Sequence, residues 1–333
     1  MRRTFLPVMQ PSGAVVGTSG HSDSCGPCSP CSFGDNGNAR ASEPGPSLGV
    51  LSVHFDGGRC HVKCPYCYLG ARPGTAQSGL AGSGALSALR EVVSHLAQNR
   101  RTSELALSVS EPWEPSFAAL CELTRLAAGF SQRVTITTTM ACALSLPETT
   151  WEHVHRLNLS VDEEKGPRKE GRVDPREVGD VLSRLPAQLE KVLIVTLSSQ
   201  AFAERLLSGL LAELIAVPQV HKVALSALKP PPPFCDRAFW LSALSRLAPL
   251  LHKELHNRLF LDCYVEARIL GLGDCPARPD LSPASKEEKA LGPLAFRACV
   301  YQPEPDVVAK SPADLLHHLA TFSAPKRCPF PID

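Results

Sequence analysis

Two features are missing from this sequence: a long uninterrupted apolar segment and an excess of charge of either sign. The most apolar stretch, Leu206 to Val220, contains Glu213 and Pro218 and is too short to cross a bilayer. Lysine and arginine number 34, and aspartate and glutamate 33, so the whole chain has no field that would gather phosphate groups or anionic lipid. We therefore expect neither a membrane nor a nucleic acid as a partner.

We also expect no secretion signal. The basic residues near the start are followed by Pro11, Ser12 and Gly13 and not by an apolar core. Without such a signal, 13 cysteines in short spacings favour metal binding in a reducing compartment over a disulfide framework. We therefore expect a cytoplasmic, metal-binding protein.

The chain begins with a low-complexity segment, residues 1–47. It is rich in Gly, Pro and Ser, a composition that predicts a disordered leader. Its cysteines Cys25, Cys28 and Cys31 are spaced like the start of a ferredoxin-type run, but Asp35 replaces the fourth cysteine that such a run needs. We prefer an ordinary leader, with an extra metal site or a redox tail as the alternatives.

From residue 48 onward, short apolar strands alternate with helical patterns. Residues such as Leu89, Val93 and Leu96 recur at helical spacing between the strands. This alternation predicts a parallel sheet with right-handed crossovers. The predicted strands are 48–55, 105–109, 134–138, 157–161, 192–197 and 222–225.

Six strand–helix pairs suit an α/β fold, namely a partial (β/α)6 TIM-like barrel over residues 48–255. Residues 256–333 then form a small cysteine-bearing extension that begins with a seventh strand, Leu259 to Val265. Active residues of such barrels lie at the carboxyl ends of the strands. We expect the substrate to meet the segments that follow Phe55, Val109, Thr138, Val161, Leu197 and Ala227.

Three cysteines, Cys60, Cys64 and Cys67, follow the first predicted strand with Cys-x3-Cys-x2-Cys spacing. A closed structural zinc site needs four protein ligands. A cubane [4Fe-4S] cluster held by three thiolates instead leaves one iron free to bind a reactant. The missing fourth ligand therefore favours a reactive iron-sulfur cluster over a zinc loop or buried thiols.

This loop resembles the signature of the radical S-adenosylmethionine (radical SAM) enzymes, in which an aromatic residue precedes the last cysteine; Tyr66 stands there. The resemblance covers roughly residues 48–255, although only the cysteine loop is motif-specific. It implies a [4Fe-4S] cluster on the three cysteines, S-adenosylmethionine (SAM) on the free iron, and a reductant such as flavodoxin or ferredoxin. It also implies reductive cleavage of SAM to a 5′-deoxyadenosyl radical that abstracts hydrogen from a substrate.

The resemblance implies several cofactor contacts. Tyr66 would lie beside the adenine, mainly through its backbone. Ser110 and Glu111 stand where the family often has Gly-Gly-Glu-Pro to hold the methionine amino group, but here both glycines are replaced. An ordinary turn that begins the next helix is the alternative for Ser110 and Glu111.

Polar residues also follow the fourth predicted strand. Ser160 and Asp162 flank Val161 at the expected mouth of the barrel, where they could hydrogen-bond the ribose hydroxyls or the methionine carboxylate of SAM. The alternative for Asp162 is that it begins a solvated, charged loop.

The C-terminal extension carries a cysteine set of its own: Cys263, Cys275, Cys299 and Cys328. The arrangement is similar to the twitch and SPASM extensions of some radical SAM enzymes, although one spacing is a residue short and later Cys-x2-Cys pairs are missing. It implies a second [4Fe-4S] cluster, with dispersed buried thiols as the alternative. Such extensions commonly serve peptide or cofactor maturation.

The sequence thus predicts a radical SAM enzyme acting on an unknown peptide or small molecule. The alternatives are a non-catalytic iron-sulfur scaffold, favoured by the replaced glycines near Ser110, and a zinc-binding module.

Overall fold

The computed structural model describes residues 49–54, 85–98, 102–109, 114–129, 133–162, 173–227, 237–254, 257–262, 280–284, 292–299 and 305–322. The chain divides into two compact units, residues 1–43 and 44–333, and every described residue belongs to the second. The predicted leader with Cys25, Cys28 and Cys31 lies outside the described residues.

Seven parallel strands lie side by side in chain order and form the main part of one sheet. Each strand pairs in parallel with the next along the chain, as expected for strands joined by helical crossovers. The α/β class predicted from the sequence is therefore confirmed. The strands are β1 (Gly49–His54), β2 (Thr102–Ser108), β3 (Arg133–Thr139), β4 (Arg156–Val161), β5 (Glu190–Thr196), β6 (Lys222–Ser226) and β7 (Leu259–Leu261).

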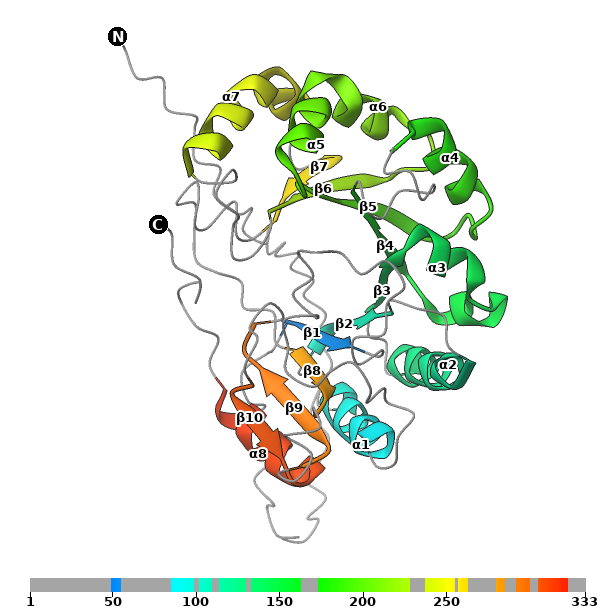
Figure 1. The fold of residues 1–333 in the computed structure, drawn as a ribbon. Helices are drawn as coiled ribbons and strands as arrows, with labels where there is room; N and C mark the ends of the chain where they lie inside the picture. Colours follow the sequence, from blue (N-terminus) through cyan, green and yellow to red (C-terminus); the bar gives the residue numbers. More distant parts are fainter. Residues whose placement is uncertain are drawn as a thin grey trace, which may run out of the picture. The chain divides into compact units, whose positions relative to one another are not determined.

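Helices follow the first six of these strands and lie along one face of the curved sheet (Figure 1). The predicted order of six strand–helix pairs is confirmed at this level. The helices are α1 (Ala85–Gln98), α2 (Glu114–Gly129), α3 (Met140–Ser145), the 3-10 helix η2 (Glu148–His153), α4 (Pro175–Ser183), α5 (Gln200–Arg205), the π-helix η3 (Leu206–Leu210), α6 (Leu211–Ala216) and α7 (Arg237–Glu254).

The π-helix lies inside the segment Phe202 to Leu214, whose apolar residues Phe202, Leu206, Leu210 and Leu214 recur at helical spacing. Gly209 has φ 141°, a value that side-chain-bearing residues rarely adopt. The apolar residues nevertheless continue to pack on the core, and Phe202, Leu206 and Leu214 are at most 1% exposed. The kink therefore leaves the buried face of the segment intact.

Side chains alternate between the two faces of the sheet, as they must along a strand. One face packs under the helices, and most of its residues are apolar and at most 1% exposed. We call the opposite face the inner face; it carries mainly polar, charged or small residues. The residues under the helices include Leu51, Val53, Leu105, Leu107, Val134, Ile136, Leu157, Leu159, Val161, Leu193, Val195, Val223 and Leu225.

The C-terminal part of the chain extends the same sheet beyond β1. Strand β8 (Asp280–Pro283) pairs in parallel with β1, and β9 (Leu294–Arg297) and β10 (Val307–Ala309) continue in antiparallel fashion. Helix α8 (Pro312–Thr321) begins at Ser311, whose hydroxyl accepts from the Asp314 amide. The resulting sheet has ten strands, in the order β10-β9-β8-β1-β2-β3-β4-β5-β6-β7.

This sheet runs across the boundary predicted between residues 255 and 256. The division into residues 1–47, 48–255 and 256–333 stays a prediction. Among the described residues, no helix combines the length and apolarity that a bilayer crossing requires.

Candidate active site at the carboxyl ends of the strands

The carboxyl ends of β4 to β7 bring four polar residues into one row on the inner face. Val161 pairs with Val195, so Asp162 follows β4 beside Thr196 of β5. Thr196 pairs with Ser226 of β6, and Asp262 follows β7 beside Ser226. We call Asp162, Thr196, Ser226 and Asp262 the carboxyl-end row. Because reactants of parallel α/β folds bind at this edge, the row is the candidate site.

The two predicted cofactor contacts that lie among the described residues, Ser160 and Asp162, stand at the carboxyl end of β4. Ser160 is half-buried on the inner face, whereas Val161 between it and Asp162 points under the helices and is fully buried. Asp162 has no exposed surface. The Asp162 side chain is therefore not itself solvated, whereas residues 163–172, on which the alternative of a solvated loop depends, lie outside the described residues.

Asp262 forms a clamp with the end of β6. The Ser226 hydroxyl and the Ala227 amide donate to the same carboxylate oxygen, Oδ2, at 2.6 Å and 3.2 Å. The Asp262 amide in turn donates to the Leu225 carbonyl at 2.9 Å. Three hydrogen bonds thus fix β6 to the residue after β7.

Sequence reasoning missed this clamp. It placed Asp262 inside a longer strand, Leu259 to Val265, whereas β7 ends at Leu261. The available signal was a single acidic residue at the end of the apolar run Leu259-Phe260-Leu261. Because an unpartnered buried carboxylate is costly, such a residue should have indicated a hydrogen-bonding partner on a neighbouring strand.

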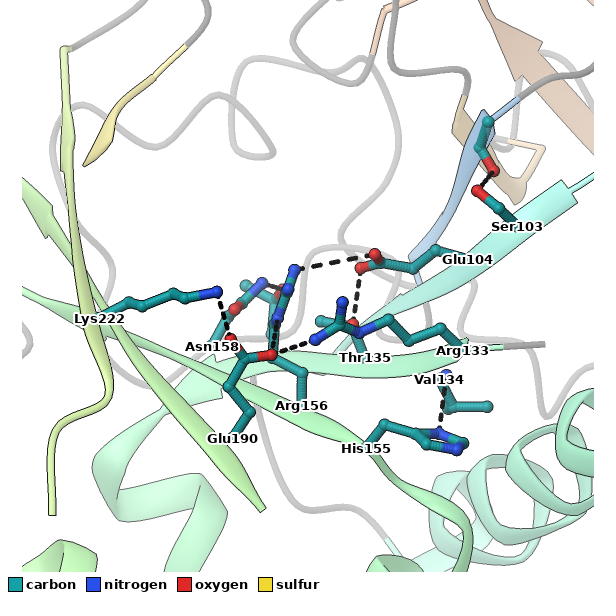
Figure 2. A network of polar contacts seen from close by, with 12 residues as sticks. Ser103, Glu104, Arg133, Val134, Thr135, His155, Arg156, Asn158, Glu190 and Lys222 are labelled. Atoms are coloured by element: carbon teal, nitrogen blue, oxygen red, sulfur yellow. Dashed lines mark hydrogen bonds and ion pairs between the residues drawn. The ribbon is translucent and has the colours of Figure 1, made fainter. Parts of the chain in front are cut away.

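The amino ends of the strands carry a second polar cluster on the inner face, drawn in Figure 2. Glu190 lies at its centre and accepts from Lys222 at 2.6 Å and from Arg156 Nε at 2.9 Å. Arg133 contacts the same carboxylate. Arg156 also lies 3.7 Å from Glu104. We call these five charged residues the ionic network.

The ionic network holds its central carboxylate in the charged form. Burial alone would raise the pKa of Glu190, but hydrogen bonds from Lys222 and Arg156, and their positive charges, lower it to about 2. Thr135 adds a hydrogen bond of 2.6 Å to Glu104. Since its charged groups already bind one another, the network is suited to closing this end of the inner face and not to binding a reactant.

Most of the predicted ligand residues lie outside the part of the chain that the structure describes. Within the described ranges, no group of three or more His, Cys, Asp or Glu side chains is arranged to hold a metal ion. The predicted residues outside these ranges are Cys60, Cys64, Tyr66, Cys67, Ser110, Glu111, Cys263, Cys275 and Cys328.

Cys299 is the described member of the predicted auxiliary set, and it is 6% exposed. It follows β9, which runs antiparallel to β8 and so ends at the amino-end edge of the parallel strands. Asp262, directly before Cys263, lies at the carboxyl-end edge. The other three cysteines of the set, Cys263, Cys275 and Cys328, lie outside the described residues, so the four-cysteine site stays a prediction.

Comparison with known proteins found no family model that matches the sequence, and no curated protein matches it either. Solved structures of SuiB from Streptococcus suis share the fold. SuiB alone superposes with a TM-score of 0.55 at 12% identity, covering 84% of this chain and 67% of SuiB.

Two further SuiB structures match equally well. SuiB bound to S-adenosylmethionine gives a TM-score of 0.56 at 12% identity, with 84% of this chain and 67% of SuiB covered. SuiB bound to its precursor peptide SuiA gives 0.55 at 11% identity, with 82% and 64% covered. At such identities the likeness shows a shared fold, and this chain spans about two thirds of the length of SuiB.

Proposed function

We propose that this protein is a radical SAM enzyme that modifies a peptide. The observation that carries the proposal is the Cys60, Cys64 and Cys67 triplet, which follows β1 in a chain that shares its fold with a SAM-binding protein. Sequence motif and fold were found independently, and they support the same cofactor.

The residues present fit these cofactors. Three thiolates are soft ligands suited to iron, and their number leaves one corner of a [4Fe-4S] cluster open. With SAM bound there, the cluster would supply a 5′-deoxyadenosyl radical able to abstract hydrogen from a substrate. The protein itself has to bind and orient the reactants and exclude water.

The carboxyl end of β4 would perform the binding. Ser160 lies on the inner face and Asp162 follows it in the buried row, where they would accept or donate hydrogen bonds to the polar parts of SAM. Tyr66, Ser110 and Glu111 are the further contacts that we propose. The ionic network would close the opposite end of the inner face, so that reactants enter at the carboxyl ends of the strands.

The curved sheet with helices along one face supports a partial (β/α)6 barrel as the finer description of the fold (Figure 1). A peptide substrate is supported by the SuiB structure that contains the precursor peptide SuiA. A flavodoxin or ferredoxin would supply the electron. An auxiliary cluster on Cys263, Cys275, Cys299 and Cys328 is a secondary proposal.

The test compares two triple variants of the full chain, purified without oxygen. Replacing Cys60, Cys64 and Cys67 by Ala should remove the iron and sulfide of one cluster and abolish formation of 5′-deoxyadenosine and methionine from SAM. Replacing Cys25, Cys28 and Cys31 by Ala is the matched control and should leave both properties unchanged.

Two results would contradict the proposal. Zinc without iron in the wild-type protein would favour a zinc-binding module. An intact cluster without SAM cleavage after reduction would favour an iron-sulfur scaffold.

A further inference from the structure

The clamp at Asp262 belongs to a continuous set of hydrogen bonds across three strand ends. Asp262 binds Ser226 and Ala227 at the end of β6. The Ser226 carbonyl accepts from the Leu197 amide at 3.0 Å, which ties the end of β6 to the end of β5. Hydrogen bonds therefore connect Asp262 to the end of β5 through the end of β6.

The end of β5 adjoins the proposed SAM contacts. Thr196, directly before Leu197, stands beside Asp162 in the carboxyl-end row, and Ser160 pairs with Ile194. The clamp is itself buried: Asp262 is 9% exposed, Ser226 7% and Ala227 4%. A buried set of bonds resists displacement, because each bond lost would leave a desolvated polar group without its partner.

We propose that Asp262 is a positioning residue for SAM: it holds the carboxyl ends of β6 and β5 in the register that places Ser160 and Asp162 against the cofactor. The inference rests on the proposed function. Asp262 acts through the strand ends and does not contact the reactants. Both bonds from β6 fall on one carboxylate oxygen, so the role requires an acceptor atom at that point and not a negative charge.

The test measures the dissociation constant of SAM and the unfolding temperature on cluster-containing, full-length protein. Asp262→Ala should weaken SAM binding about tenfold, since misplaced contacts lose much of their binding energy. Asp262→Asn, whose side-chain oxygen can accept both hydrogen bonds, should stay near the wild-type affinity.

Asp306 provides a matched control away from the row. Its carboxylate accepts from the Ala298 amide at 2.6 Å, a bond of the same kind within the β9 and β10 hairpin. Asp306→Ala should lower the unfolding temperature and leave SAM affinity unchanged. A purely structural role for Asp262 predicts that Asp262→Ala behaves in the same way.

Ser226→Ala is the variant to use if Asp262→Ala does not fold. It deletes one hydrogen bond of the clamp and should also weaken SAM binding. Wild-type affinity in the folded alanine variants would overturn the inference, as would an Asp262→Asn protein as weak as Asp262→Ala. If the wild-type protein neither binds nor cleaves SAM, the proposed function fails and the inference fails with it; if the wild type is active, only the inference is at stake.

Discussion

The two ends of the inner face contrast in how their polar side chains are used. At the amino ends, the five charged residues of the ionic network bind one another. At the carboxyl ends, the row contains single polar groups on neighbouring strands, of which Ser226 and Asp262 form the clamp. Asp162 lies six positions after Arg156, a distance of roughly 20 Å at the rise of a strand.

The two ends of the inner face therefore have different proposed roles: the amino ends stabilise the sheet, and the carboxyl ends bind the reactants. A network whose charged groups bind one another stabilises the sheet and offers little to a ligand. A row of hydroxyls and carboxylates at the edge where loops begin can bind a reactant, at a cost to stability. Substitutions at the amino ends should therefore mainly lower the unfolding free energy, and substitutions at the carboxyl ends should mainly lower SAM binding and cleavage.

The largest effect is expected at the carboxyl ends. The double variant Ser160→Ala, Asp162→Asn should lower kcat/KM for SAM cleavage about a hundredfold, because one proposed contact loses its hydroxyl and the other its negative charge. Its unfolding free energy should change far less than its activity. Turnover at the wild-type level in the folded double variant would remove the proposed contrast between the two ends.

At the amino ends, Glu190→Gln should destabilise the protein while the folded fraction keeps its activity. The carboxylate is 19% exposed and binds three cations, and its pKa of about 2 against 4.5 corresponds to about 3 kcal/mol. Urea unfolding of both proteins measures the difference. A loss of SAM affinity in the folded variant would show that this end also shapes the reactant site.

The same variant has a defined pH dependence. Because the pKa of Glu190 is lower in the folded protein, about 2 instead of 4.5, its stabilisation is fully present above pH 4.5 and is lost as the pH falls through 2. The stability difference between wild type and Glu190→Gln should therefore shrink across this window. A constant difference from pH 6 to about pH 2 would show that packing and not charge dominates.

The smallest effect is expected for an exposed ion pair on the helical side of the sheet. Arg90 of α1 binds Glu122 of α2, with side chains 42% and 33% exposed. Arg90→Gln should cost less than about 1 kcal/mol and the cost should fall with added salt, since water and ions screen such pairs. Urea unfolding at low and high salt measures this cost. A loss of unfolding free energy as large as that of Glu190→Gln would contradict the expected difference between this ion pair and the ionic network.

Local patterns predicted the order of strands and helices, because apolar spacing along each segment is a local property. They placed the fifth strand at 192–197, whereas β5 begins at Glu190. The two charged residues at its start have partners outside the strand: the ionic network binds Glu190, and the Leu182 and Leu185 carbonyls accept from Lys191 at 2.8 Å and 3.1 Å. No spacing rule reveals partners of this kind.

Prediction of the site was limited in the same way. Ser160 and Asp162 were predicted because polar residues at the end of a strand are a local signal. The register between strands brings Thr196, Ser226 and Asp262 together. This register cannot be inferred from any one segment of the sequence. Short elements were also missed: α3 is six residues long, and β8 and β9 have four residues each.

The pairing of β8 with β1 has a consequence for synthesis. One neighbour of β1, the strand β2, follows it closely in the chain and is synthesised soon after it. The other neighbour, β8, begins only at Asp280. On the ribosome, that open edge stays available to other nascent chains until most of the polypeptide has emerged. The high contact order of this late step should make it slow, so chaperone shielding of β1 would decide how much of the protein escapes aggregation.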